Sequence, residues 1–413
     1  MTGSDQASAL IFPRTFGDNA VTDPHPVYGT FREAGPVHYT EVVDGCKVWV
    51  VTRFEDVQAV LDDPARLSSN PRFGPQEWLD QFGLLRDENG KFIVAENMLY
   101  ADPPLHTRLR KLVSKAFTPR RIQQLAPYIT SLCEQVLDDL AAKGRAELIY
   151  DYAYLIPLTV ISELLGMPEA DRERFQTVSN LIMVGRPVDP EQVTAAQWEL
   201  IGMIGALVSA KRENPADDLL TALIAARDED DKLDELELIS MAGLLIIAGQ
   251  ETTGNLIGNA LLELISHPER LDELRRDPSG WPRAVDELLR LQSPALGTWR
   301  FALEDVEIAG TTIPAGQAVL ALLASADRDP RHFDDPESYD PHHARPGHLV
   351  FGHGIHHCLG VSLARLEAEI ALTALASRLT DIKLAVPAGQ LRWRPSLMRG
   401  LIELPVTFTA TAR

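Results

Sequence analysis

The segment FGHGIHHCLG, Phe351 to Gly360, is the most informative stretch of this chain, and the strongly helical sequence VSLARLEAEIALTALASRL follows it directly. Cys358 therefore lies at a junction between a loop and a helix, where backbone amides and the positive helix end stabilise a thiolate. Glycines at Gly352, Gly354 and Gly360 permit tight turns and let the backbone approach a flat ligand closely. The segment thus predicts an ionised sulfur presented to a flat ligand.

Haem iron suits a thiolate presented in this way, because the sulfur pushes electron density toward O–O cleavage. The three cysteines, Cys46, Cys133 and Cys358, are widely spaced and odd in number, which is a poor basis for a disulfide framework. Taken singly, a cysteine is more often a small buried hydrophobe. Zinc is a competing cofactor because histidines surround Cys358, but a second cysteine pair is lacking.

The sequence resembles the cytochrome P450 superfamily, whose cysteine loop reads Phe-Gly-x-Gly-x-His-x-Cys-x-Gly. Every fixed position of that pattern is matched, by Phe351, Gly352, Gly354, His356, Cys358 and Gly360. The resemblance covers nearly the whole chain and is greatest to the soluble bacterial branch, in particular to actinobacterial members that tailor natural products. It implies haem b with Cys358 as the axial thiolate. It also implies one mainly α, roughly triangular haem-thiolate monooxygenase domain over residues 1–413, with small β-sheets.

Helices dominate the first two thirds of the chain. Apolar residues recur at three- and four-residue intervals over Arg120–Gly144, Ile149–Met167 and Glu191–Arg212, which predicts amphipathic helices. A longer helix is predicted from Asp234, where Glu237 completes a capping-box pattern, to the His267-Pro268 pair. Its middle, LLIIAG, is apolar on every side, so we expect a central, buried helix, which the resemblance places over the haem.

Strand signals are few. Val37–Tyr39 and Lys47–Thr52 flank an Asp44-Gly45 turn and predict a hairpin, and short strands are predicted at Val306–Ile308 and Ala318–Leu323. The intervening stretch Pro64–Tyr100 carries several glycines and aromatic residues. A long loop of this kind is typical of a lid or a binding segment.

The central helix contains AGQETT, Ala248 to Thr253, which places polar groups in an apolar surface. The sequence alone leaves two interpretations open: a threonine bonded to its own helix, or a functional site. The resemblance favours function. It implies that Thr252 and Glu251 deliver protons to bound dioxygen, while Ala248 and Gly249 leave room for it.

Glu287 and Arg290 lie one turn apart, a spacing that by itself indicates only a surface ion pair. The resemblance makes them a buried structural pair beneath the haem, with Arg345 as a less regular third member. The haem propionates require cationic or hydrogen-bonding partners. The resemblance supplies four residues for this role, each of which could also be an ordinary solvated side chain: His106, Arg110, Arg300 and His356.

Partners follow from charge and length. The formal charge of -20, from 39 basic and 59 acidic residues, argues against nucleic acid or anionic membrane. The N-terminus shows no secretion signal, so we expect a cytoplasmic protein. We also expect a monomer. Only a short tail follows the last helix, so electrons from NAD(P)H are expected through a separate ferredoxin and ferredoxin reductase.

A local basic cluster predicts the ferredoxin docking surface: Arg108, Lys111, Lys115, Arg120 and Arg121.

The resemblance also suggests an apolar pocket for a hydrophobic small molecule, although each residue could equally be ordinary core: Phe92, Met98, Met183, Leu244, Leu296, Trp299 and Leu397. We expect hydroxylation or epoxidation of a mid-sized natural product such as a macrolide or polyketide. Oxidative C–C or C–O coupling of an aromatic or peptide-derived substrate is the alternative. A non-catalytic haem sensor or carrier is a third, which the Glu251-Thr252 pair disfavours.

Overall fold

The computed structural model describes residues 22–41, 47–75, 97–115, 117–182, 190–227, 233–342, 347–394 and 396–411. The chain divides into two compact units: unit 1 comprises Met1–Gly83, Asn259–Val361 and Gly389–Leu401, and unit 2 comprises Leu84–Gly258, Ser362–Ala388 and Ile402–Arg413. The mainly helical class with small sheets is confirmed. The single domain over 1–413 stays a prediction.

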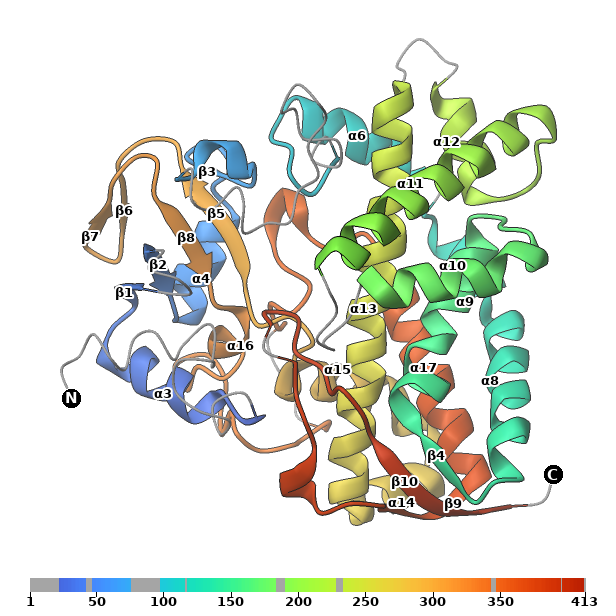
Figure 1. Ribbon diagram of the computed structural model, residues 1–413. Helices are drawn as coiled ribbons and strands as arrows, with labels where there is room; N and C mark the ends of the chain where they lie inside the picture. Colours follow the sequence, from blue (N-terminus) through green and yellow to red (C-terminus); the bar gives the residue numbers. More distant parts are fainter. Residues whose placement is uncertain are drawn as a thin grey trace. The chain divides into compact units, whose positions relative to one another are not determined.

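Unit 1 holds most of the strands (Figure 1). Its helical elements are α3 (His25–Ala34), α4 (Phe54–Leu61), η4 (Pro71–Phe73), α14 (Pro268–Arg276), η6 (Pro278–Gly280), α15 (Trp281–Leu291), α16 (Leu323–Ala326) and η7 (Gly354–His356). Its strands are β1 (Val37–Glu41), β2 (Lys47–Val51), β3 (Leu67–Ser68), β5 (Thr298–Ala302), β6 (Val306–Ile308), β7 (Thr311–Ile313) and β8 (Ala318–Ala321).

Five of these strands form one sheet in the order β1-β2-β8-β5-β3, and β6 pairs with β7. The predicted hairpin is confirmed, because β1 and β2 are antiparallel with Val37 opposite Val51. β8 is fully buried and ends at Ala321, two residues before the predicted end. Leu322 leaves the strand conformation, and a short helix starts at Leu323. Two buried hydrophobic clusters cover the faces of this sheet and fix it as the core of unit 1.

Unit 2 consists mainly of helices and also holds a small antiparallel sheet of order β4-β10-β9. Its elements are α6 (Leu105–Ser114), α7 (Pro119–Gln124), α8 (Ala126–Ala141), β4 (Arg145–Glu147), η5 (Ile149–Ala153), α9 (Leu155–Leu164), α10 (Glu169–Ile182), α11 (Pro190–Glu213), α12 (Leu219–Arg227), β9 (Leu379–Leu384) and β10 (Pro405–Ala410). Three elements cross the boundary or begin at it: α13 (Glu235–Ser266), α17 (Val361–Arg378) and η8 (Ala388–Gln390).

The long helix α13 is confirmed, and its capping box forms as expected. The amide of Asp234 donates to Glu237 Oε2 at 2.9 Å, and the amide of Glu237 donates to Asp234 Oδ1 at 2.7 Å. Two backbone donors at the start of the helix are thereby satisfied. Most of the helix is buried, which explains why its sequence is apolar on all sides.

Two predicted helices are each broken in two. Arg120–Gly144 consists of α7 and α8, because Pro127 has no amide to continue the first helix and instead occupies the first turn of α8. Ile149–Met167 begins as the π-helical turn η5 before α9, which carries Pro157 in its first turns. The hydrophobic period is the same on both sides of each break, so periodicity could not locate it.

Helix α11 is, between Glu191 and Glu213, long and apolar enough to cross a membrane, with a mean hydropathy of 1.3. It packs against α10 and α12. Its buried apolar side chains recur every three or four residues: Ala196, Leu200, Ile204, Leu207 and Val208. This one-sided burial is typical of an amphipathic helix in a folded unit.

A buried carboxyl in unit 2 gives a stability prediction. Glu367 of α17 is 2% exposed, its Oε2 has no hydrogen-bond partner among the described residues, and burial raises its pKa to about 8. The folded state therefore holds a proton that the unfolded state releases near pH 4.5, so stability falls as pH rises from about 4.5 to 8. We expect Glu367→Gln to remove this fall and to stabilise the protein above pH 8 by on the order of 3 kcal/mol.

Urea unfolding of both proteins at several pH values measures this effect. The matched control is Glu369→Gln, two residues along the same helix and only half-buried, which should change the pH dependence less. Parallel stability curves for the wild type and Glu367→Gln would contradict the buried, protonated state of Glu367.

Candidate functional site

The cysteine loop, defined here as Leu349–Gly360, is closed by its own backbone. The amide of Gly352 donates to the carbonyl of Leu349 at 2.7 Å, and the amide of Cys358 donates to the carbonyl of Phe351 at 2.8 Å. Gly352 and Gly354 have φ of 71° and 66°, in the left-handed region that favours glycine. A Cβ at Gly354 would also lie 2.7 Å from the carbonyl oxygen of Leu61. The backbone conformation at Gly352 and Gly354, together with the close contact at Gly354, therefore explains why glycine occupies both positions.

The loop presents its sulfur rather than burying it. Cys358 is exposed and forms no disulfide, whereas Cys133, the other described cysteine, is wholly buried. Helix α17 starts three residues later, so the thiol lies next to a helix N-terminus as predicted. A Cβ at Gly360 would come within 3.8 Å of the Cys358 sulfur. An accessible thiol beside glycine backbone is the arrangement that a flat, sulfur-ligated cofactor requires.

The histidines of the loop make contacts within unit 1. His356 Nε2 is 2.6 Å from Ser69 Oγ, and His353 Nε2 is 3.1 Å from Gln58 Nε2 and 3.2 Å from Asp62 Oδ2. These contacts fix the loop against α4 and the end of β3. Among the described residues, no group of three or more His, Cys, Asp or Glu is arranged to hold a metal ion. The zinc alternative therefore has no ligand set in the described part of the chain.

The predicted propionate residues come from two places. In unit 1, Arg300 of β5 is 4% exposed and donates to the carbonyl of Trp299, while β3 pairs with β5 through Ser68 and Phe301. The bond between Ser69 and His356 therefore brings the cysteine loop to the end of β3, the edge strand that pairs with the Arg300 strand β5. In unit 2, His106 and Arg110 lie one turn apart on α6, with His106 buried and Arg110 half-buried.

In the middle of α13, one stripe is more accessible than most of the helix. Leu244, Glu251 and Thr252 are half-buried and Ala248 is exposed, at spacings that put them on one helix face. The hydroxyl of Thr252 donates to the carbonyl of Ala248 at 2.6 Å, so the helix-bonded alternative describes its geometry. That bond uses the hydroxyl hydrogen and leaves the oxygen lone pairs as acceptors. An exposed alanine beside this hydroxyl fits a small ligand lying on this face.

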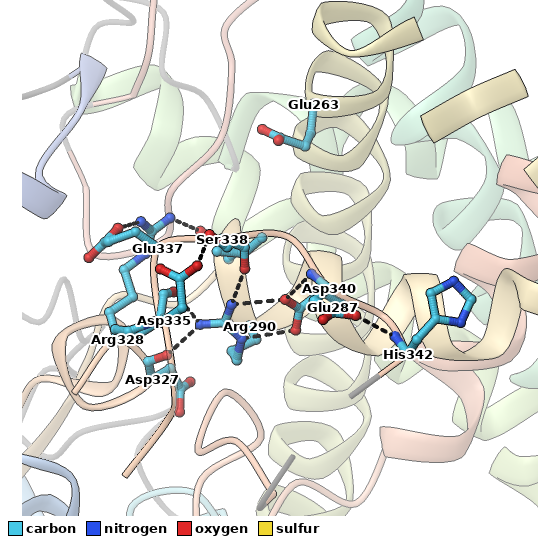
Figure 2. A network of polar contacts seen from close by, with 12 residues as sticks. Glu263, Glu287, Arg290, Asp327, Arg328, Asp335, Glu337, Ser338, Asp340 and His342 are labelled. Atoms are coloured by element: carbon cyan, nitrogen blue, oxygen red, sulfur yellow. Dashed lines mark hydrogen bonds and ion pairs between the residues drawn. The ribbon is translucent and has the colours of Figure 1, made fainter. Parts of the chain in front are cut away.

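The Glu287–Arg290 pair is buried, not a surface ion pair. Arg290 donates to both carboxylate oxygens of Glu287 at 2.9 Å (Figure 2). Its other N–H groups donate to three carbonyls, those of Asp327 at 2.9 Å, Pro336 at 2.7 Å and Ser338 at 3.0 Å. All five guanidinium donors are used. The pair therefore holds the chain after α16 in place, which agrees with the structural role predicted for it.

Several predicted residues lie outside the described residues or in the core. Phe92, Met183 and Arg345 are outside the described residues, as is most of the predicted loop between 64 and 100. Met98 is buried at 9% exposure. Leu296 and Leu397 belong to a buried cluster of unit 1, and Trp299 packs against it. Their burial agrees with the ordinary-core alternative, and a pocket role stays a prediction.

Comparison with known proteins identifies the family. The Cytochrome P450 family profile matches residues 195–278 and 282–380. The chain is 42% identical over 395 residues to cytochrome P450 monooxygenase PikC from Streptomyces venezuelae. The alignment covers 94% of this chain and 92% of PikC. The chain belongs to the cytochrome P450 family. Mycinamicin IV hydroxylase/epoxidase from Micromonospora griseorubida is 39% identical to this chain. The alignment covers 92% of this chain and 94% of the hydroxylase/epoxidase.

A solved P450 structure shares the fold. The Bacillus subtilis bacillaene polyketide synthase P450 PksS superposes with a TM-score of 0.87 at 37% identity, covering 95% of this chain and 98% of PksS. As a P450, the chain is a haem-thiolate monooxygenase that uses dioxygen and draws electrons from NAD(P)H through redox partners. The exposed Cys358 thiol and the glycine-lined loop around it fit that cofactor.

Sequence reasoning missed two residues that support the loop. Ser69 bonds to His356, and Asp327 bonds to the amide of Leu349. Ser69 lies in a stretch that carries no motif, so nothing in the sequence distinguished it. Asp327 lies in a DRDP segment that matches none of the motifs described above. Its burial was the missing signal, and burial of a lone aspartate is not readable from sequence.

Proposed function

We propose that this P450 hydroxylates or epoxidises a mid-sized hydrophobic natural product, such as a macrolide or polyketide. The observation that carries the proposal is the near full-length similarity to a mycinamicin IV hydroxylase/epoxidase, combined with the exposed Cys358 thiol in a complete P450 cysteine loop. The similarity to the polyketide-associated PksS supports the same substrate class.

In this proposal, Cys358 ligates the haem iron, and Phe351, Gly352 and Gly360 shape the loop around the sulfur. The bound haem supplies dioxygen activation. Thr252 accepts a hydrogen bond from a water, because its own hydrogen is donated to Ala248. Glu251 passes protons from solvent toward that water, and Ala248 with Gly249 keeps this face of α13 open.

The propionates are assigned to His106, Arg110, Arg300 and His356. Arg300 and the histidines carry N–H groups in sites that are at least partly buried, where a carboxylate partner is bound more strongly than in water. Glu287 and Arg290 maintain the fold behind the cysteine loop. Leu244 and Trp299, both half-buried, are the described pocket residues that remain accessible to a substrate.

Product mass tests the proposed reaction. Incubation with candidate macrolides and polyketides, NADPH and a surrogate ferredoxin system should give a product heavier by one oxygen atom, labelled when the gas phase is ¹⁸O₂. A dimer or a product lighter by two hydrogens would instead support the coupling alternative. The non-catalytic sensor or carrier disagrees with the monooxygenase family, so binding of a compound without turnover would exclude only that compound as the substrate.

We also propose a cytoplasmic, monomeric protein reduced by a ferredoxin that docks on the basic cluster. Two members of the predicted cluster are paired with acids: Arg108 with Glu237, and Arg121 with Asp217. Their charge is therefore partly neutralised. The three exposed members carry the docking charge: Lys111, Lys115 and Arg120.

Charge reversal at these exposed residues should slow reduction by ferredoxin. We expect the triple variant Lys111→Glu, Lys115→Glu and Arg120→Glu to lower the reduction rate at low salt by roughly 10-fold, because electrostatic steering contributes at least that much. The rate should also lose its salt dependence. Stopped-flow reduction measures both, with Lys383→Glu on β9 as the exposed control. An unchanged rate in the triple variant would move the docking surface elsewhere.

A further inference from the structure

The start of the cysteine loop is held by a buried carboxyl that the P450 loop pattern does not contain. Asp327 follows α16 and is 0% exposed. Its Oδ1 accepts the amide of Leu349 at 2.7 Å, and the amide of Val350 also interacts with its carboxyl group. Leu349 and Val350 are themselves buried, at 2% and 7% exposure, directly before the Phe351–Gly360 motif.

The same residue is bonded to the Glu287–Arg290 pair through its backbone. Arg290 Nη1 donates to the carbonyl oxygen of Asp327, as Figure 2 shows. Glu287 Oε1 also accepts the amide of Asp340 at 2.9 Å. Asp327 thus connects two networks, one through its carbonyl and one through its carboxyl. The connection continues into the loop, where the carbonyl of Leu349 accepts the amide of Gly352.

We propose that the Asp327 carboxyl is a positioning residue, which transmits the rigidity of the Glu287–Arg290 pair to the cysteine loop and so fixes the sulfur of Cys358. This inference rests on the proposed role of Cys358 as the iron ligand. The Asp327 carboxyl itself contacts the backbone at the loop entry and acts on the sulfur through that backbone.

The free-energy cost of burying the Asp327 carboxyl indicates that its contact with the loop amides is not incidental. Burial raises the pKa of Asp327 to about 7, and the loop amides and Arg290 lower it in opposition. Oδ2 has no hydrogen-bond partner among the described residues. Burying a carboxyl with one oxygen that lacks a hydrogen bond destabilises the folded state. Hydrogen bonds from buried amides to the other oxygen offset this destabilisation.

The test compares substitutions that change the carboxyl but keep the backbone carbonyl that Arg290 uses. Asp327→Ala removes the acceptor, and Asp327→Asn keeps an oxygen at the Oδ1 position. With the haem-loaded protein, we expect Asp327→Ala to release haem to excess apomyoglobin about 10-fold faster or more, as loss of an outer-shell partner does at metal sites. The sulfur-ligated fraction of the carbon monoxide complex should fall, and Asp327→Asn should restore both values.

Asp329→Ala is the matched control. Asp329 is 2% exposed, and its carboxylate accepts the amide of Phe54 at 3.0 Å at the start of α4 instead of a loop amide. This variant should lower thermal stability yet leave the sulfur-ligated fraction unchanged. If Asp329→Ala and Asp327→Ala reduce that fraction equally, or if Asp327→Asn fails to rescue it, the proposal is overturned.

Two further measurements complete the design. Should Asp327→Ala not fold, Asp327→Ser keeps a polar side chain too short to reach Leu349, and the same losses are expected. Hydrogen exchange at the amides of Leu349 and Val350 needs no haem signal. Faster exchange in Asp327→Ala but not in Asp329→Ala supports the anchoring, and equal exchange contradicts it. This readout stays valid if the wild type lacks sulfur-ligated haem, which would refute the proposed function separately.

Discussion

Cys358→Ser is expected to reduce product formation by more than about 100-fold, because even the outer-shell partners of a bound metal contribute about 10- to 100-fold. Serine is nearly the same size as cysteine, so the loop backbone, with its bond from the amide at 358 to the carbonyl of Phe351, should persist. The hydroxyl does not ionise at neutral pH and donates far less electron density to iron than a thiolate. Turnover with the product assay measures the loss.

The matched control is Cys133→Ser. Cys133 lies in α8 with a wholly buried side chain, and burial raises the pKa of its thiol to about 12, so it stays protonated. This variant is expected to lose some stability and to keep its turnover per haem. Comparable activity in Cys358→Ser and the wild type would exclude position 358 as the ligand.

Thr252→Ala is expected to uncouple electron transfer from product formation. NADPH consumption should continue, while product per NADPH falls by about 10-fold or more, since proton delivery by a positioned group contributes about 10²- to 10⁴-fold. The electrons should appear as released hydrogen peroxide. The physical reason is the loss of the one hydroxyl oxygen that the bond to Ala248 orients as an acceptor on the open face of α13.

Neighbouring substitutions separate chemistry from packing. Thr252→Ser keeps the hydroxyl and should retain most of the coupling. Thr253→Ala removes a threonine on the buried face, at 4% exposure, and should lower stability without releasing peroxide. Full coupling in Thr252→Ala, measured as product formed per NADPH oxidised, is the result that excludes this role.

Most of the architecture was predictable because its determinants are local. The capping pair at Asp234 and Glu237 and the hairpin at Val37–Val51 each depend on a few neighbouring residues. The helix breaks at Pro127 and before Leu155 were not predictable, because the hydrophobic period continues across both of them. A proline that can start a helix looks the same in sequence as one that interrupts it.

Among the site residues, those in a contiguous motif were likewise predictable, and those brought together by the fold were not. Cys358 and its glycines were predictable because the loop motif is contiguous, and the positive φ angles at Gly352 and Gly354 confirm why glycine is needed. Glu287 and Arg290 were readable only through resemblance, because their spacing is also that of a surface pair. Asp327 and Ser69 contact the loop from positions 22 and 287 residues away from their partners. Such contacts exist only once the fold is formed.

The carbon monoxide spectrum of the purified, dithionite-reduced protein tests the central claim most directly. If the sulfur of Cys358 binds haem iron, the complex shows the strongly red-shifted Soret band of thiolate-ligated haem, and Cys358→Ser lacks it. An unshifted band in the wild type, or a protein that binds no tetrapyrrole after reconstitution, would contradict the account.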